Sequence, residues 1–309
     1  MENTIYDLII IGSGPAGLSA AIYAQRACLN TVVIEKTGIS GGQILTTSEV
    51  DNYPGLPGIG GFDLGMKMRQ HAENLNSQFV TGEVAKIAKI QDIFQITLTD
   101  GGILRSRTLI IATGASHQKL GIPGENSLTG MGVSYCATCD GAFFRGKDTA
   151  VIGGGDVAVE DAIFLARICR HVHVIHRRDR FRAAKVLSDR LLSLENVTVH
   201  WNSIPLSIVG ENTVSGLTIE DKETKVQKTL DVNGVFIAIG MAPDTDLVRG
   251  LIDLNPAGYI AADETCRTSV PGIFAAGDVR TKQLRQVVSA VSDGANAVYS
   301  AQRYLEEGR

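Results

Sequence analysis

No apolar run in the 309-residue sequence approaches the roughly 18 residues that a membrane-spanning helix needs. Neither sign of charge dominates, because 29 Lys and Arg residues stand against 33 Asp and Glu residues, so a global basic surface for nucleic acid or an anionic membrane is not expected. The five cysteines are scattered, which excludes the disulfide framework of a small extracellular protein. The start, Met1 to Asp7, lacks the basic and apolar regions of a secretory signal. These absences predict a globular protein of the reducing cytoplasm, with neither nucleic acid nor membrane as a partner.

The length fits two domains of about 150 residues, and a strand, glycine turn, helix and strand occur in that order twice. In the first copy we expect strands at 5–11 and 31–34 and a helix at 18–27. The glycines of the turn permit a sharp bend and close approach to a pyrophosphate, and an acid after the second strand can bind ribose hydroxyls. This dinucleotide-binding pattern predicts a cofactor site at Gly12, Gly14, Pro15, Ala16, Gly17, Glu35 and Lys36.

The second copy has strands at 149–152 and 172–175 and an expected helix at 159–168. Bases replace the acid of the first copy, and Arg182 is expected one helical turn beyond Arg178. Arginine suits a 2′-phosphate, so NADPH is predicted here, although a solvated basic helix start would show the same residues. The predicted site residues are Gly153, Gly155, Asp156, Ala158, His176, Arg177, Arg178 and Arg182.

A flavin is the predicted ligand of the first copy, because hydride chemistry commonly joins a nicotinamide to a flavin and FAD carries an adenosine diphosphate half. Near the C-terminus a strand at 272–276 ends in Gly277-Asp278. An acid at a strand end beside the cofactor crevice can accept hydrogen bonds from a ribityl chain.

A single C-x-x-C, Cys136 to Cys139, precedes the second copy and is followed directly by Asp140. Two cysteines at this spacing can form a redox-active disulfide. A zinc site would need a second ligand pair, which the sequence does not offer nearby, so no metal is predicted; an inert thiol pair is the other alternative. Asp140 is either a general acid for a departing thiolate or the cap of the next turn. The other cysteines, Cys28, Cys169 and Cys266, are expected to pack as small apolar groups.

Taken in order, the segments GSGPAG, Gly41-Gly42-Gln43, CATCD, GGGDVAVED, HRRDRFR and AAGDV resemble the low-molecular-weight bacterial thioredoxin reductases over essentially the whole chain. The resemblance implies an α/β protein with two Rossmann-like three-layer domains, the NADPH domain being inserted into a discontinuous FAD domain. The implied boundaries are 1–114 and 245–309 for the FAD domain and 115–244 for the NADPH domain. It also implies a homodimer, a thioredoxin or thioredoxin-like protein as partner, and rotation of the NADPH domain during turnover.

The resemblance implies residue roles as well. Cys139 would be the sulfur next to the flavin, Cys136 the thiol that attacks the partner's disulfide, and Asp140 the proton donor. Cofactor contacts would also come from Gly42, Gln43, Asn52, Gly277, Asp278, Arg285 and Gln286.

Two departures from many relatives concern the partner. Ala142 precedes Phe143 and Phe144 where two aromatic residues often follow the motif directly, and Met131 stands where arginine is frequent. The two phenylalanines could also be core residues. A different thioredoxin-like partner is therefore one alternative. Another is a ferredoxin- or oxygen-dependent flavin disulfide reductase or dithiol oxidase on the same scaffold, but the retained arginines argue against both the ferredoxin- and the oxygen-dependent enzyme.

Overall fold

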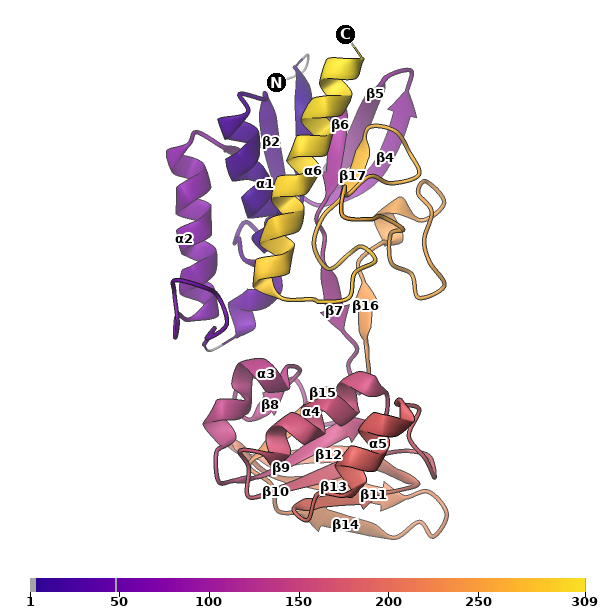
Figure 1. The fold of residues 1–309 in the computed structure, drawn as a ribbon. Coiled ribbons are helices and arrows are strands. Elements are labelled where there is room, and N and C mark those ends of the chain that lie inside the picture. The colour runs from indigo at the N-terminus through magenta and orange to yellow at the C-terminus, as the bar shows by residue number, and fades with distance from the viewer. Residues whose placement is uncertain (1–3, 48, 309) are drawn as a thin grey trace. The chain divides into compact units, whose positions relative to one another are not determined.

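The protein folds into two compact units, seen in a computed structural model that describes residues 4–47 and 49–308, without the side chain of residue 46. The first unit comprises 1–46, 50–116 and 242–309, and the second comprises 47–49 and 117–241. The second unit is inserted in the first, and the α/β class agrees with the prediction. The chain passes between the units through β7 (Ala115–His117) and β16 (Met241–Pro243), which pair with each other in a two-stranded sheet (Figure 1).

The first unit is built on five parallel strands. Its elements before the insertion are β1 (Ile5–Ile11), α1 (Pro15–Arg26), β2 (Thr31–Glu35), η1 (Gly42–Thr46), α2 (Gly61–Asn74), β3 (Gln78–Thr81), β4 (Val84–Ile90), β5 (Ile93–Leu98) and β6 (Ile103–Ile111). After the insertion come η3 (Asp246–Val248), β17 (Ile273–Ala275) and α6 (Val287–Glu307). The parallel order is β3-β2-β1-β6-β17, and the first part of β6 also pairs antiparallel with β5, which pairs with β4.

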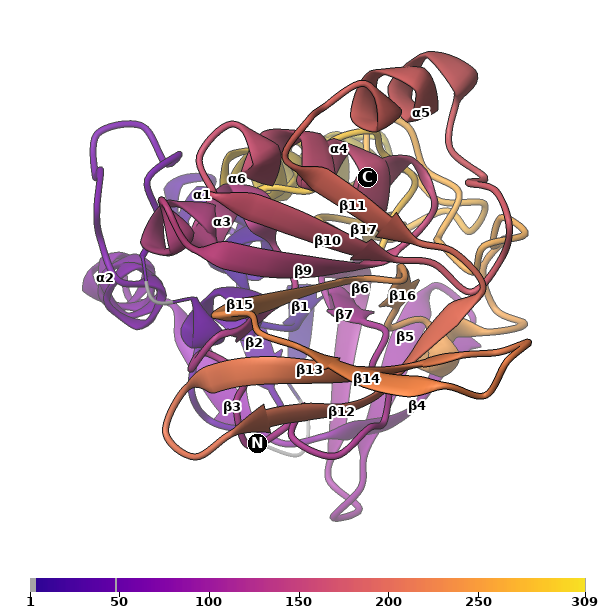
Figure 2. The ribbon, with the colours of Figure 1, turned by 90° about the horizontal axis from the view of Figure 1, so that it is seen from below.

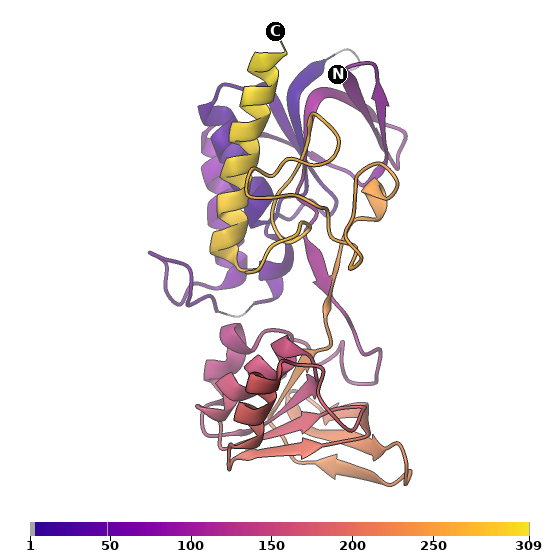
Figure 3. The same cartoon turned by 45° about the vertical axis from the view of Figure 1, so that its right-hand side comes forward.

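Successive residues of β1 enter different cores because side chains alternate across a strand. Leu8 and Ile10 pack against small residues of α1 and α6, whereas Ile9 and Ile11 pack against the β4–β5 hairpin and the segment after η3. Gly294 of α6 allows the two helices to approach closely, since a Cβ there would overlap the backbone of Ala16. In Figure 3 the yellow helix α6 lies on the same side of the sheet as α1. The sheet is thus the middle of three layers.

The second unit repeats this three-layer plan. Its elements are β8 (Val133–Ser134), α3 (Ala137–Asp140), η2 (Gly141–Phe144), β9 (Asp148–Gly153), α4 (Asp156–Ala166), β10 (His171–Ile175), α5 (Lys185–Leu192), β11 (Val197–His200), β12 (Ser203–Gly210), β13 (Val214–Asp221), β14 (Gln227–Leu230) and β15 (Gly234–Ala238). Its parallel sheet has the order β11-β10-β9-β15-β8, and Figure 2 shows strands β11, β10, β9 and β15 of this sheet between the helices α3, α4 and α5 and the antiparallel sheet β12-β13-β14.

Three local expectations were wrong. Both helices that follow a glycine turn begin earlier than predicted: α1 begins at Pro15 and α4 at Asp156, so the last motif residue, Gly17 or Ala158, already lies within the helix. Arg182 does not lie one helical turn beyond Arg178, because the chain between β10 and α5 is irregular and α5 begins only at Lys185.

None of the helices in the described part of the chain is long and apolar enough to cross a membrane.

Candidate active site

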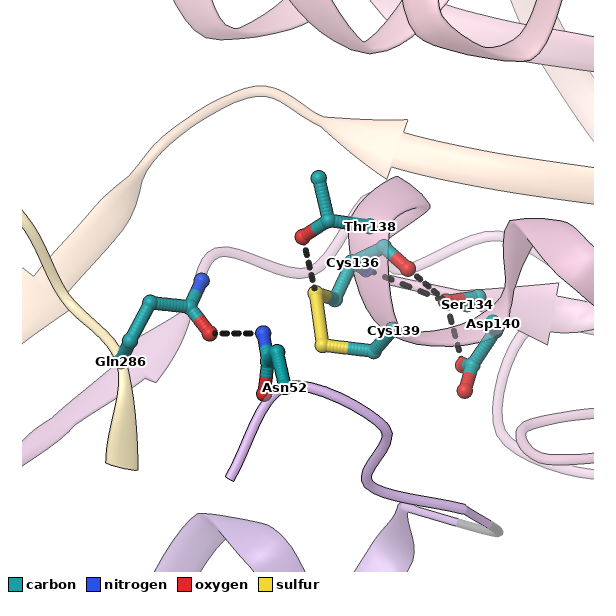
Figure 4. Close-up of a disulfide and its surroundings, with 7 residues drawn as sticks. All are labelled: Asn52, Ser134, Cys136, Thr138, Cys139, Asp140 and Gln286. Carbon is teal, nitrogen blue, oxygen red and sulfur yellow. Dashed lines mark hydrogen bonds between the residues drawn. A yellow bond between two sulfur atoms is a disulfide. The ribbon is translucent and has the colours of Figure 1, made fainter. Parts of the chain in front are cut away.

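The redox motif lies at the start of the short helix α3. Cys136 and Cys139 form a disulfide with a Cα–Cα distance of 5.3 Å, within the usual range for such bonds (Figure 4). Both cysteines are partly exposed, and the Thr138 hydroxyl lies 3.4 Å from Cys136 Sγ. Partial exposure is one condition for thiol–disulfide exchange, in which a thiolate must reach the bond.

The side chain of Asp140 is bound by a residue of β8 and does not cap a helix. Its Oδ2 accepts a hydrogen bond of 2.7 Å from Ser134 Oγ, and no side-chain capping bond is formed at η2. Oδ1 is buried and has no hydrogen-bond partner among the described residues. Burial raises the pKa of Asp140, and the hydrogen bond from Ser134 opposes that shift. A carboxyl group whose proton is held more tightly than usual, one residue from a disulfide, can serve as an acid.

The predicted residues of the first glycine turn converge in the first unit. Glu35 Oε2 accepts hydrogen bonds from the backbone N–H and hydroxyl of Ser13, at 3.0 and 2.5 Å, so the acid is fixed against the turn. Gly12 has φ +103° and a Cβ there would overlap the carbonyl oxygen of Ala112. A Cβ on Gly14, in contrast, would come no nearer than 4.0 Å to its neighbours, so the turn is open on one side. Open backbone at a helix N-terminus is the geometry that accepts phosphate.

Two distant segments join that turn. A Cβ on Gly42 would lie 3.2 Å from Gly14 Cα, and one on Gly277 would lie 2.9 Å from Ala16 Cβ. The structure therefore brings the segments around residues 42 and 277 against the first glycine turn. The described residues nearby include two buried polar atoms without a hydrogen-bond partner, Asp278 Oδ1 and Arg285 Nε.

Arg285 and Gln286, at the start of α6, are both held in place. The Arg285 guanidinium lies 4.2 Å from the centroid of the Tyr259 ring, and Gln286 Oε1 accepts a hydrogen bond of 2.9 Å from Asn52 Nδ2 (Figure 4). Burial raises the pKa of Asp278, while the charges of Lys282 and Arg285 lower it. Lys36, by contrast, is exposed and paired with Glu83 at 2.7 Å.

A buried ionic cluster behind Asp278 was not predicted. Asp293 of α6 accepts hydrogen bonds from the Gly277 N–H, from two guanidinium nitrogens of Arg280 and from Lys282 Nζ, all between 2.6 and 2.9 Å. The three charged side chains are at most 7% exposed. Asp293 thus fastens the loop that contains Asp278 to helix α6. The sequence offered no signal for this cluster beyond an acid among the small residues of the helix.

Replacing Asp293 with alanine should destabilise the protein by about 3–5 kcal/mol, because two buried cations lose their counter-ion. Urea unfolding of the holoenzyme measures this. Asp246→Ala is the matched control, since it breaks an exposed ion pair with Arg249 and should leave the midpoint almost unchanged. Equal effects of the two substitutions would contradict the proposed role of the buried cluster.

The second glycine turn is also open on one side. A Cβ on Gly153 would lie 2.5 Å from the Ala238 carbonyl oxygen, whereas Gly155 has nothing within 4 Å. Asp156 is fixed at the start of α4, where its Oδ1 accepts the N–H of Ala184 at 2.7 Å. Ala158 is fully buried beneath the turn. This turn, like the first, leaves backbone accessible to a phosphate.

The basic residues beside this turn differ in exposure. Arg177, Arg178 and Arg182 are exposed, and the N–H of Arg182 donates to the Gly154 carbonyl at 2.8 Å, which brings it to the turn without a helix. His176 is buried, with Nδ1 3.0 Å from the Gly153 carbonyl and Nε2 2.9 Å from the Arg180 carbonyl. Burial lowers its pKa. Its ring therefore ties the basic loop to the glycine turn: a neutral imidazole donates to one of the two carbonyls, and an imidazolium donates to both.

Outside these clusters, the cysteine and aromatic expectations were partly correct. Cys169 and Cys266 are buried, but Cys28 is exposed, because it follows the end of α1. Phe144 belongs to the core of the second unit, whereas Phe143 is 45% exposed. Phe143 therefore remains accessible to a partner.

Comparisons with known proteins agree with this architecture. The family model for pyridine nucleotide-disulphide oxidoreductases matches residues 6–294. The thioredoxin reductases of Listeria monocytogenes and Bacillus subtilis are 45% and 44% identical over 307 residues, which is 99% of this chain and 96% of each relative. The crystal structure of thioredoxin reductase from Streptococcus pyogenes has 46% identity and a TM-score of 0.91, with 99% of both chains covered. The chain therefore belongs to the pyridine nucleotide-disulphide oxidoreductase family and, within it, to the group of the thioredoxin reductases.

Proposed function

We propose that this protein is a cytoplasmic, homodimeric thioredoxin reductase that carries electrons from NADPH, through FAD and the Cys136–Cys139 disulfide, to oxidised thioredoxin or a thioredoxin-like protein. The observation that carries the proposal is the partly exposed disulfide in a unit that also contains an open glycine turn and exposed arginines. A dithiol and a nucleotide site in the same unit are the parts that such electron transfer requires.

The first unit fits FAD. Its glycine turn would hold the pyrophosphate, Glu35 the adenosine ribose, and Asp278 the ribityl chain through its unpartnered Oδ1. Arg285 Nε is a second buried atom without a partner among the described residues, and Gln286, at the start of α6, would also contact the cofactor. Bound FAD supplies the two electrons that open the disulfide.

The second unit fits NADPH, with the glycine turn at Gly153 to Gly155 taking the pyrophosphate. The exposed guanidinium groups of Arg177, Arg178 and Arg182 would bind the 2′-phosphate, because arginine donates to phosphate in a bidentate manner. His176 would act through the loop that it anchors rather than through a free ring nitrogen.

The residues of the redox motif would then act in order. When two electrons open the disulfide, both sulfurs become thiolates, and Asp140 can donate its proton to that of Cys139, becoming a carboxylate that takes the proton back before Cys139 attacks. The Cys136 thiolate attacks one sulfur of the partner's disulfide, and the other partner sulfur leaves as a thiolate. The Cys139 thiolate then attacks Cys136 Sγ, which releases the second partner sulfur and restores the Cys136–Cys139 bond.

Anaerobic titration of the holoenzyme with NADPH tests this electron path. We expect the enzyme to accept four electrons, two in the flavin and two in the disulfide, and Cys136→Ser/Cys139→Ser to accept two. A wild-type capacity of two electrons would contradict communication between flavin and disulfide. Failure of NADPH to reduce the flavin at all would favour a ferredoxin-dependent or oxygen-dependent enzyme instead.

A further inference from the structure

Ser134 is a buried hydroxyl that contacts both Cys136 and Asp140. It lies on β8, where Ser134 pairs with Phe236 of β15, and it is 5% exposed. Its Oγ lies 2.7 Å from Asp140 Oδ2, accepts the Cys136 N–H at 3.1 Å, and lies 3.3 Å from the Cys136 carbonyl oxygen (Figure 4). One position on β8 therefore links Asp140 to the backbone of Cys136.

The three contacts can be satisfied in two ways. A serine hydroxyl has one hydrogen and two lone pairs, and the Cys136 N–H occupies one lone pair in either arrangement. When Asp140 is ionised, the hydroxyl hydrogen points to Oδ2. When Oδ2 carries a proton, Asp140 can donate to the second lone pair, and the hydroxyl hydrogen turns to the Cys136 carbonyl oxygen at 3.3 Å.

We propose that Ser134 is a positioning residue whose hydroxyl turns between these two arrangements, so that Asp140 keeps a hydrogen-bond partner both as an acid and as a carboxylate. The proposal rests on the proposed function, in which Asp140 donates a proton to a thiolate and later regains one. In that transfer the O–H bond of Asp140 breaks, an S–H bond forms, and Ser134 reverses from acceptor to donor without losing its own proton. Oδ2 thereby keeps a hydrogen-bond partner throughout the cycle, whereas Oδ1 has none among the described residues.

Among the described residues, few other titratable groups lie on the elements around Asp140. Helix α4 packs against α3 and carries Asp156, Glu160 and Asp161, and burial together with Glu160 raises the pKa of Asp161 to about 7. The segment η2 has no titratable side chain, and on the other side of Ser134 the Tyr135 hydroxyl is bound to Glu125. Among the described residues, burial raises the pKa of Asp140 and the hydrogen bond from Ser134 lowers it.

The test measures the titration of Asp140 directly, in oxidised holoenzyme containing ¹³C-labelled aspartate, with Asp140→Asn to assign the resonance. Ser134→Ala should shift the midpoint to higher pH, because the carboxylate loses its hydrogen bond, and Ser134→Thr should restore the wild-type midpoint. Ser127→Ala, which removes an exposed hydroxyl in the same unit, should cause no shift. An unchanged midpoint in Ser134→Ala, or the same shift in Ser134→Thr, would overturn the proposal.

A second measurement needs no substitution at Ser134. If the hydroxyl turns, the Cys136 amide proton resonance of the wild-type protein must titrate with the same midpoint as the Asp140 carboxyl. A Cys136 amide that does not follow Asp140 would overturn the proposal even if Ser134→Ala failed to fold. Neither measurement uses turnover, so a failure of the proposed function, which would appear as absent disulfide reduction by NADPH, is distinguished from a failure of this inference.

Discussion

Replacing Cys136 with serine is expected to abolish thioredoxin reduction, by a factor of about 10³ or more, while leaving FAD binding and flavin reduction by NADPH intact. A serine hydroxyl at neutral pH is far less nucleophilic than a thiolate, and without Cys136 no disulfide can form with Cys139. Thioredoxin-dependent NADPH oxidation measures the loss, and the flavin absorbance spectrum shows that the cofactor site is preserved.

Cys139→Ser distinguishes the roles of the two sulfur atoms. It should also end turnover, but Cys136 can still attack, so a covalent mixed disulfide with thioredoxin should accumulate and be visible on a non-reducing gel. Cys28→Ser is the matched control, because Cys28 is an exposed free cysteine in the other unit. Accumulation of the mixed disulfide in Cys136→Ser instead of Cys139→Ser would reverse the assigned roles.

The second large effect is expected at the basic loop. Replacing Arg177 and Arg178 with serine should lower kcat/KM for NADPH by about 10²-fold or more, since a hydrogen bond to a charged group contributes about 1.5–3 kcal/mol. The value for NADH, which lacks the 2′-phosphate, should change little, so the preference between the two cofactors should largely disappear.

Steady-state kinetics with both cofactors provides the measurement. Arg167→Ser/Arg190→Ser is a suitable control, because it removes the same charge from exposed positions on the α4 and α5 side of the unit. If the NADPH preference survived in the Arg177 and Arg178 variant, the 2′-phosphate would bind elsewhere. If the control lost it equally, the effect would reflect total charge rather than these contacts.

Local patterns predicted most of the fold. The glycine turns and the apolar strands flanking them are contiguous in sequence, so both βαβ units could be recognised from them. The helix starts at Pro15 and Asp156 were placed too late, because hydrophobic periodicity begins after the glycines while the backbone is already helical. The irregular loop before α5 was not predicted, because an arginine-rich sequence is also typical of an exposed helix.

The supporting contacts of the site could not be predicted, because they join residues that are far apart in sequence or have several plausible partners. Asp293 reaches Gly277 and Arg280 only because α6 packs on α1 beside β17. Tyr259 under Arg285 and Asn52 beside Gln286 likewise depend on tertiary packing. Ser134 is near Asp140 in sequence, but its direction was not predictable without the pairing of β8 with β15.

The most direct test of the account is NADPH oxidation by the purified FAD-loaded protein under anaerobic conditions, with and without oxidised thioredoxin from the same organism. We expect sustained oxidation only when thioredoxin is present, with one thioredoxin disulfide reduced for each NADPH consumed. Flavin that is reduced by NADPH but does not turn over with thioredoxin would contradict the central claim.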